Sequence, residues 1–330
     1  MSEFLREWEL PQDGLGARTV AIVGYGNQGR AQAQNLRDSG VEVVVGQRPG
    51  RSADRAREDG FSVVPVEQAV QAGDVVQLLL PDESMADIYR SQVAPHLRRG
   101  QTLLFSHGFN IHFGFIAPPE GVDVGLISPK GPGHQLRTVY EQGGGLAALW
   151  AVFRDFSGGA RVTVLAYAQA LGCARAGLLE TSFSEETETD LFGEQAVLCG
   201  GVPQLAQAAF DTLVQAGYQP EVAYFECFHE LKLIVDLLYT GGLTGMHRAI
   251  SDTAEYGGYE AGGRVVDGAI QPALRATLAD IRSGAFARRW VEENRNGRRN
   301  FEASRAQSED VLMERVGRAV RMRIGLERRD

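Results

Sequence analysis

Residues 19–38 read TVAIVGYGNQGRAQAQNLRD, and this stretch decides the fold. Its first five residues are β-branched or apolar and predict a buried strand, whereas residues 30–38 have a helical pattern. The turn Gly24-Tyr25-Gly26-Asn27-Gln28-Gly29 joins the two. Glycines at this spacing permit a tight turn and let a pyrophosphate approach the N–H groups at the start of the helix. We therefore predict a dinucleotide-binding site here; a purely structural glycine turn is the alternative.

The first half of the chain alternates apolar runs with helical patterns. The predicted strands are residues 19–23, 41–45, 75–80, 102–105 and 123–128. Such alternation predicts a Rossmann-type, doubly wound α/β domain, with a parallel sheet covered by helices on both faces. Ligands of these sheets gather beyond the carboxyl ends of the strands.

The second half shows no strand signal after about residue 183. Helical patterns occupy residues 188–198, 202–216, 220–239 and 265–282. A strand-like run at residues 176–181 could belong to either half. We therefore predict two domains, a dinucleotide-binding domain at residues 1–182 and an all-helical domain at residues 183–330.

Composition excludes several classes of protein. The 330 residues are 44% hydrophobic and 23% charged, the balance of a globular protein, and 33 basic against 42 acidic residues disfavour nucleic-acid binding. We find no signal peptide and no apolar run of the roughly 20 residues that a membrane span needs. The three cysteines lack C-x-x-C spacing. We expect a cytoplasmic protein that acts on a small molecule, without nucleic-acid or membrane partners.

The segment after the second predicted strand bears on the choice of cofactor. An NAD-specific site usually has an acidic residue about 20 positions beyond the glycine turn, where it binds a ribose hydroxyl. This chain instead has Arg48, Arg51 and Ser52, which can bind a 2′-phosphate. The pattern favours NADPH, and Asp38 and Asp54 keep NADH open as the alternative.

Two pairs of carboxylates have helical spacing. Asp190 and Glu194 are four residues apart, as are Glu226 and Glu230, and apolar residues extend both faces, which predicts that the pairs point toward a core. Buried carboxylates need neutralisation, and a divalent cation such as Mg²⁺ is one remedy. A solvated acidic helix start is the alternative, and we adopt it for Glu185, Glu186 and Glu188.

Two loops with chemically active side chains follow the fourth and fifth predicted strands. The first holds His107 and the second holds Lys130. Histidine titrates near neutral pH, and lysine changes its pKa readily when desolvated, so both residues are candidates for proton transfer or for orienting a polar substrate.

Together these segments resemble the ketol-acid reductoisomerases, also called acetohydroxyacid isomeroreductases, of the shorter bacterial and archaeal class. The resemblance runs almost the full length of the chain. It is carried by the glycine turn and by residues 107–113 (HGFNIHF), 129–134 (PKGPGH), 185–195 (EETETDLFGEQ), 223–232 (AYFECFHELK) and 250–257 (ISDTAEYG).

The resemblance implies an enzyme of valine, leucine and isoleucine synthesis. It would convert 2-acetolactate or 2-aceto-2-hydroxybutyrate into a 2,3-dihydroxy-3-methyl acid. Mg²⁺ would assist an alkyl migration, and NADPH would then reduce the resulting 2-keto acid. It also implies a knotted helical domain and a homodimer or larger assembly with shared active sites.

The resemblance further assigns roles to individual residues. Asp190, Glu194, Glu226 and Glu230 would bind Mg²⁺, with Glu230 also catalytic. Ser251 would hold the substrate carboxylate, and His107 and Lys130 would serve proton transfer. The cofactor site would include the glycine turn, Arg48, Arg51, Ser52, Asp82 and Gly133.

This chain also departs from the family pattern. Leu146-Ala147, Phe153–Phe156 and Gly262-Gly263 replace commoner residues, the loop at residues 46–54 is one residue shorter, and residues 322–326 are atypical. A paralogue that reduces a related 2-keto acid therefore remains an alternative. A non-catalytic dinucleotide sensor is another, although every expected carboxylate is present.

Overall fold

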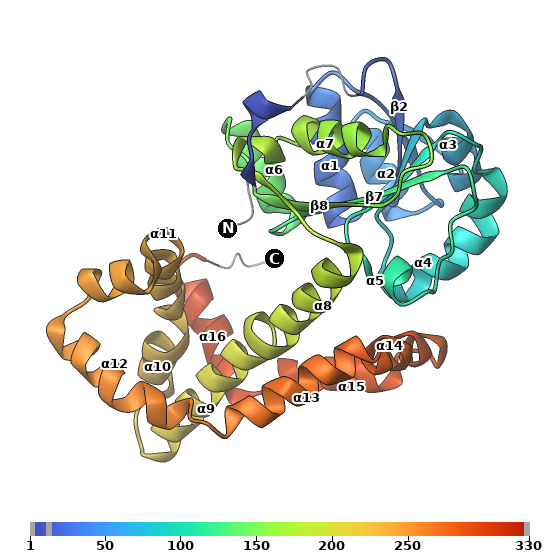
Figure 1. Ribbon diagram of the computed structural model, residues 1–330. Helices are drawn as coiled ribbons and strands as arrows, with labels where there is room; N and C mark the ends of the chain where they lie inside the picture. Colours follow the sequence, from blue (N-terminus) through green and yellow to red (C-terminus); the bar gives the residue numbers. More distant parts are fainter. Residues whose placement is uncertain (1–3, 11–14, 327–330) are drawn as a thin grey trace. The chain divides into compact units, whose positions relative to one another are not determined.

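A computed structural model describes residues 4–10 and 15–326 of the chain. The chain divides into two compact units, Met1–Thr189 and Asp190–Asp330 (Figure 1). The first unit contains a sheet covered by helices, and the second is built from helices.

The sheet of the first unit has nine strands among the described residues, in the order β1-β9-β8-β7-β6-β5-β2-β3-β4. The strands are β1 (Phe4–Leu5), β2 (Thr19–Val23), β3 (Glu42–Gly46), β4 (Ser62–Val64), β5 (Val75–Leu78), β6 (Thr102–Phe105), β7 (Asp123–Pro129), β8 (Ala148–Arg154) and β9 (Leu178–Glu180). All five predicted strands are confirmed, and the strand-like run at 176–181 contains β9. The neighbouring strands β7-β6-β5-β2-β3-β4 are parallel. Strand β8 pairs antiparallel with β7, and β1 pairs antiparallel with β9.

Helices cover both faces of this sheet, as the doubly wound class predicts. They are α1 (Asn27–Asp38), α2 (Arg51–Glu58), α3 (Val66–Ala72), α4 (Asp82–Ile88), α5 (Phe109–His112), α6 (Gly133–Glu141) and α7 (Ala160–Ala170). Successive residues of β2 alternate between two cores: Val20 and Ile22 pack with α1, α6 and α7, and Ala21 and Val23 pack with α3 and α4. Because side chains on both faces of β2 enter a core, every residue of the strand can be apolar.

The topology places a ligand site beside β2. Its neighbours β3 and β5 lie on opposite sides of it: the chain runs from β2 to β3 and β4 on one side, and then crosses from β4 to β5 on the other. A crevice forms at such a switch point, outside the carboxyl ends of the strands.

The second unit contains no strand among its described residues, which confirms the predicted helical domain. Helix α8 (Phe183–Gly193) leads into it, followed by η5 (Glu194–Leu198), α9 (Gly201–Gln215), α10 (Pro220–Tyr224), η6 (Phe225–His229), α11 (Leu231–Ala249), α12 (Asp252–Val265), α13 (Ile270–Arg282), α14 (Ala285–Arg295), α15 (Arg299–Glu309) and α16 (Leu312–Arg323). One small core joins α9, α10 and α16 through Phe210, Tyr224 and Val320. No helix in the described parts of the chain is long and apolar enough to cross a membrane.

Candidate active site

The three glycines of the turn after β2 have different physical roles. Gly24 has φ +99°, and a Cβ there would lie 2.5 Å from the Leu79 carbonyl oxygen. A Cβ on Gly29 would lie 2.0 Å from the Gly24 oxygen, so this glycine lets α1 pack directly against the turn. A Cβ on Gly26 would meet no protein atom within 4 Å. Gly26 therefore leaves open space at the start of α1, where a pyrophosphate fits.

A cavity of about 800 Å³ lies beside this turn. The ends of β2, β3, β5, β6 and β7 contribute to it, and so does α4. Its lining includes turn residues 24–28, Arg48, Ser52, Asp82, Ser106, His107 and Pro129. The volume, and the open space at Gly26, fit a dinucleotide.

Another predicted cofactor residue, Gly133, lies against the turn. It is the first residue of α6, and a Cβ there would lie 2.1 Å from the Asn27 carbonyl oxygen. The N-termini of α1 and α6 therefore meet. Both helices direct the positive ends of their dipoles to this place, which favours an anionic ligand.

Two of the three predicted phosphate-binding residues line the cavity. Arg48 and Ser52 do so, whereas Arg51 is exposed and is not part of the described lining. The acidic residues that would favour NADH are engaged elsewhere: Asp54 pairs with Arg57 at 2.9 Å, and Asp38 pairs with Arg137 at 2.6 Å.

Tyr25 fixes the glycine turn to the elements around it. Its backbone N–H donates to Gln47 Oε1 (3.2 Å), and its hydroxyl donates to Asp59 (2.8 Å). Asp59 also accepts two hydrogen bonds from Arg30 on α1. The turn is thus tied to the residue after β3 and to the end of α2.

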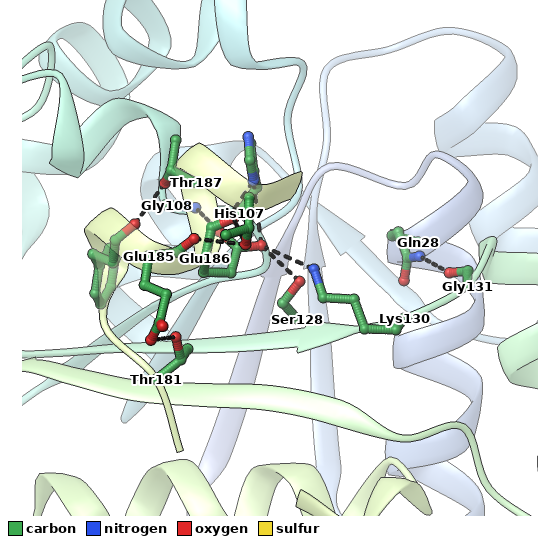
Figure 2. A network of polar contacts seen from close by, with 12 residues as sticks. Gln28, His107, Gly108, Ser128, Lys130, Gly131, Thr181, Glu185, Glu186 and Thr187 are labelled. Carbon is green, nitrogen blue, oxygen red and sulfur yellow. Dashed lines mark hydrogen bonds and ion pairs between the residues drawn. The ribbon is translucent and has the colours of Figure 1, made fainter. Parts of the chain in front are cut away.

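Glu186 on α8 is the centre of a polar network at the ends of β6 and β7 (Figure 2). Its carboxylate accepts hydrogen bonds from Ser128 Oγ (2.8 Å) and the Gly108 backbone N–H (2.9 Å). His107 Nδ1 lies 3.1 Å from it and Lys130 Nζ 3.4 Å. The structure therefore brings His107 and Lys130 together around Glu186, a carboxylate that was predicted to lie in a solvated helix start.

The environment of Glu186 keeps it ionised. Burial by itself raises the pKa of this carboxyl, but the hydrogen bonds and positive charges of His107 and Lys130 outweigh burial and lower the pKa to about 2. The side chain is 0% exposed. The interpretation of Glu186 as part of a solvated helix start is therefore wrong, because the start of α8 packs on Gly108, where a Cβ would lie 2.3 Å from Thr187 Oγ1.

The two predicted metal-binding pairs lie beside π-helical turns in the second unit. Glu194 begins η5, and its carbonyl accepts from the N–H of Cys199 at 2.8 Å. Glu226 lies within η6, and the N–H of Glu230 donates to Phe225 at 3.0 Å. Both are bonds between residues five apart, and single π turns occur frequently at functional sites.

These wider turns also correct one expectation. The pairs were predicted to point toward a core through faces that continue to Leu198 and Leu233. Those residues are 67% and 54% exposed, and Glu194, Glu226 and Glu230 are exposed as well. The prediction is wrong for these three carboxylates in a single chain, whereas Asp190, Ile234 and Leu237 are half-buried. The π turns begin at Glu194 and span Glu226, so the helical period assumed for the two faces is not kept there.

Ser251, the predicted substrate ligand, is the N-cap of α12. Its Oγ accepts a hydrogen bond from the N–H of Ala254 at 3.2 Å. The hydroxyl hydrogen can then serve as a donor, and the start of this 14-residue helix favours an anion.

Comparison with known proteins connects both units to one family. Residues 14–177 match the family described as acetohydroxy acid isomeroreductase, NADPH-binding domain, and residues 183–325 match ketol-acid reductoisomerase, C-terminal domain. The structure is similar to that of an NADH-preferring ketol-acid reductoisomerase from an uncultured archean, with 44% identity, a TM-score of 0.95, and coverage of 97% of this chain and 98% of that one.

More distant structures share the fold alone. A semialdehyde dehydrogenase NAD-binding protein from Cupriavidus necator is 18% identical with a TM-score of 0.63, over 81% of this chain and 98% of that one. A pyrroline-5-carboxylate reductase from Coxiella burnetii is 13% identical with a TM-score of 0.52, over 82% and 98%.

Proposed function

The chain belongs to the ketol-acid reductoisomerase family, and on this premise we propose which cofactor, metal and residues it uses. It is an oxidoreductase of branched-chain amino-acid biosynthesis that converts an acetohydroxy acid into a 2,3-dihydroxy-3-methyl acid. The observation that carries the residue assignment is the buried Glu186 carboxylate, which contacts both Lys130 and His107, a residue of the cavity lining.

NADPH is the proposed form of the nicotinamide cofactor. Arg48 and Ser52 lie in the cavity lining, where a guanidinium and a hydroxyl suit a 2′-phosphate. Asp38 pairs with Arg137 and Asp54 pairs with Arg57, and neither carboxylate is part of the described lining. Their positions therefore support NADPH over NADH. NADH is the second candidate, because the archaeal relative prefers it.

Mg²⁺ is the proposed metal, bound by Asp190, Glu194, Glu226 and Glu230. The donor set fits, because carboxylate oxygens are the hard ligands that Mg²⁺ prefers, and both pairs adjoin π turns. When bound, Mg²⁺ supplies Lewis-acid polarisation of substrate oxygens, and the nicotinamide supplies a hydride. We assign Glu230 a catalytic role in addition to its role as a ligand, and we assign Ser251 to the substrate carboxylate.

His107 is the proposed proton-transfer residue. An ionised carboxylate only accepts hydrogen bonds, so Glu186 keeps a hydrogen on His107 Nδ1 and leaves Nε2 as the ring atom that gains or loses a proton. Lys130, held by the same carboxylate, places a positive charge at the end of β7, where it attracts a substrate oxygen.

The enzyme is proposed to work as a homodimer or larger assembly in the cytoplasm. Large apolar side chains of α11 and α12 are exposed in the single chain, among them Leu233, Tyr239, Leu243, Tyr256 and Tyr259. A surface of this kind is typical of an interface with another chain. The cysteines are free, which suits a reducing compartment.

A steady-state assay tests the proposal. Oxidation of NADPH and NADH is followed with 2-acetolactate, with and without Mg²⁺, for the wild type and Glu194→Gln. We expect activity that requires Mg²⁺, higher kcat/KM with NADPH, and a large loss in the variant. Full isomerisation by Glu194→Gln with Mg²⁺ present would refute the metal assignment, and a preference for NADH would refute the cofactor assignment.

A further inference from the structure

A chain of hydrogen bonds runs beneath the cofactor cavity, and three of its side chains, Tyr167, Gln32 and Ser106, have no role assigned so far. The Tyr167 hydroxyl on α7 donates to Gln32 Oε1 on α1 at 2.8 Å. Gln32 Nε2 donates to Ser106 Oγ at 3.0 Å and to Gln28 Oε1 at 3.2 Å. Gln28 Nε2 in turn donates to the Gly131 carbonyl at 3.0 Å (this last bond appears in Figure 2). Tyr167 and Gln32 are fully buried, whereas Gln28 and Ser106 line the cavity.

One backbone acceptor fixes the direction of this whole chain. The Gly131 carbonyl can only accept, so Gln28 must present Nε2 to it and Oε1 to Gln32. Gln32 must then present Nε2 to Gln28 and Ser106, which leaves Oε1 for the Tyr167 hydroxyl. A reversed Gln32 amide would set two carbonyl oxygens against each other in a buried place.

Ser106 receives a second donor from the other side. Gln77 Nε2 on β5 lies 3.0 Å from the same hydroxyl oxygen. A serine hydroxyl has two acceptor positions and one hydrogen to donate. Gln32 Nε2 fills one acceptor position and Gln77 Nε2 fills the other, while Gln77 Oε1 is buried without a hydrogen-bond partner. With both amides in this orientation, the hydroxyl hydrogen is directed away from them, into the cavity that Ser106 lines.

The place of Ser106 in the sheet indicates which part of a dinucleotide it meets. Arg48 and Ser52, assigned to the adenine half, follow β3, whereas Ser106 follows β6, three strands away in the order β6-β5-β2-β3. Strand spacing makes this separation about 14 Å. Ser106 therefore faces the half of the cavity next to His107.

We propose that Gln32 is a positioning residue that directs the Ser106 hydroxyl, as a hydrogen-bond donor, to an oxygen in the nicotinamide half of the cofactor. The inference rests on the proposed function, since it requires a nicotinamide cofactor in this cavity. Tyr167 donates to the remaining Gln32 atom, Oε1, and so supports the orientation that Gly131 sets through Gln28. The ligand group is the carboxamide or a ribose oxygen.

Binding measurements on whole cofactor and on its adenine end test the proposal. Calorimetric titrations compare NADPH with adenosine 2′,5′-bisphosphate, and NADH with ADP, for the wild type, Ser106→Ala, Gln32→Met and Tyr167→Phe. Loss of one hydrogen bond predicts a Kd for the whole cofactor that is about three- to tenfold higher, with the Kd of the fragment unchanged. Thermal unfolding of each variant checks that it is folded, and Ser106→Ala and Tyr167→Phe serve if Gln32→Met does not fold.

A double variant separates positioning from structural damage. If Gln32 acts through Ser106, Gln32→Met combined with Ser106→Ala weakens cofactor binding no more than Ser106→Ala alone. Gln34→Met, the same substitution on α1 outside this network, is the matched control and should bind like the wild type. Equal weakening of cofactor and fragment, or an unchanged Kd in Ser106→Ala, would overturn the inference. A wild type that binds neither NADPH nor NADH would instead refute the proposed function on which it rests.

Discussion

Ser128 at the end of β7 donates a hydrogen bond of 2.8 Å to the Glu186 carboxylate on α8. The two residues are 58 positions apart in the chain, and the bond lies in a buried environment. The bond joins the carboxyl end of β7 to the first turns of α8. The same carboxylate holds His107 and Lys130, so the connection that fastens α8 to the sheet also arranges the proposed proton-transfer groups.

Replacement of Glu186 by Gln should reduce turnover more than cofactor binding. The amide has nearly the same shape but no charge, so it no longer orients His107 and Lys130 together. We expect kcat to fall about 100-fold, a typical effect of disturbing a general acid–base group, with KM for NADPH changed less than about threefold. Steady-state kinetics with saturating Mg²⁺ measures both constants. Glu185→Gln, at the exposed neighbour, is the control, and an unaltered kcat in Glu186→Gln would contradict the assigned role.

The same substitution should change how stability depends on pH. The pKa of Glu186 is lowered from 4.5 to about 2, so its ionised form stabilises the fold above pH 4.5, and that stabilisation is lost as pH falls toward 2. We expect Glu186→Gln to have a free energy of unfolding lower by roughly 1–3 kcal/mol at pH 7, with a difference that shrinks between pH 4.5 and 2. Urea unfolding at several pH values measures this. A difference that stays constant over that range would show that the carboxylate is not the cause.

Local patterns in the sequence were sufficient for the glycine turn and the central strands. β2 occupies the predicted residues 19–23, because an apolar run that ends in glycines is a strong local signal. β1 and β4 have two and three residues and are too short to show a period. β8 was not predicted, because a short apolar run can form either a strand or a buried helix. The knot of the helical domain and its boundary after residue 182 stay predictions.

The candidate site was only partly accessible to sequence reasoning. His107 and Lys130 stand out because each follows a strand. Glu186 lies in an acidic run that looks solvated, and only the long-range contacts from Gly108 and Ser128 show that it is buried. The π turns beside Glu194 and Glu230 were also missed, because a regular period of 3.6 residues cannot reveal an inserted residue.

Two alanine substitutions in the glycine turn should affect different properties, one the stability of the fold and the other the binding of NADPH. Gly29→Ala places a Cβ 2.0 Å from the Gly24 oxygen and should destabilise the fold by several kcal/mol, because backbone must move. Gly26→Ala meets no protein atom within 4 Å and has an ordinary φ of −88°, so the fold should tolerate it while the methyl group obstructs the pyrophosphate. We expect Gly26→Ala to keep its Tm and to bind NADPH at least about tenfold more weakly. Thermal unfolding measures the Tm of each variant, and calorimetry measures its Kd for NADPH. Normal NADPH affinity in Gly26→Ala would show that the pyrophosphate binds elsewhere.

Arg48 should distinguish NADPH from NADH. Arg48→Gln removes the guanidinium from the cavity lining, so we expect KM for NADPH to rise about 10- to 100-fold, the effect of losing a charge-assisted hydrogen bond. KM for NADH should stay within about twofold, because NADH has no 2′-phosphate. Arg55→Gln, on the exposed surface of α2, is the control. Equal increases of KM for both cofactors would mean that Arg48 does not read the 2′-phosphate.

The exposed apolar side chains of the second unit should determine the oligomeric state. Tyr239 on α11 is 85% exposed in the single chain, and Val235, one turn earlier, is exposed as well. If a second copy covers this surface, Tyr239→Asp places a charge in an apolar contact and should shift the protein toward monomer, with loss of activity if sites are shared between subunits. Sedimentation velocity over a range of concentrations measures the first effect, and the acetolactate assay measures the second. Trp8→Asp, at an aromatic residue that is 78% exposed in the first unit, is the control and should leave the sedimentation coefficient unchanged. A wild type that sediments as a monomer at assay concentration would contradict the shared site, because the apolar surface of α11 would then have no second copy to cover it.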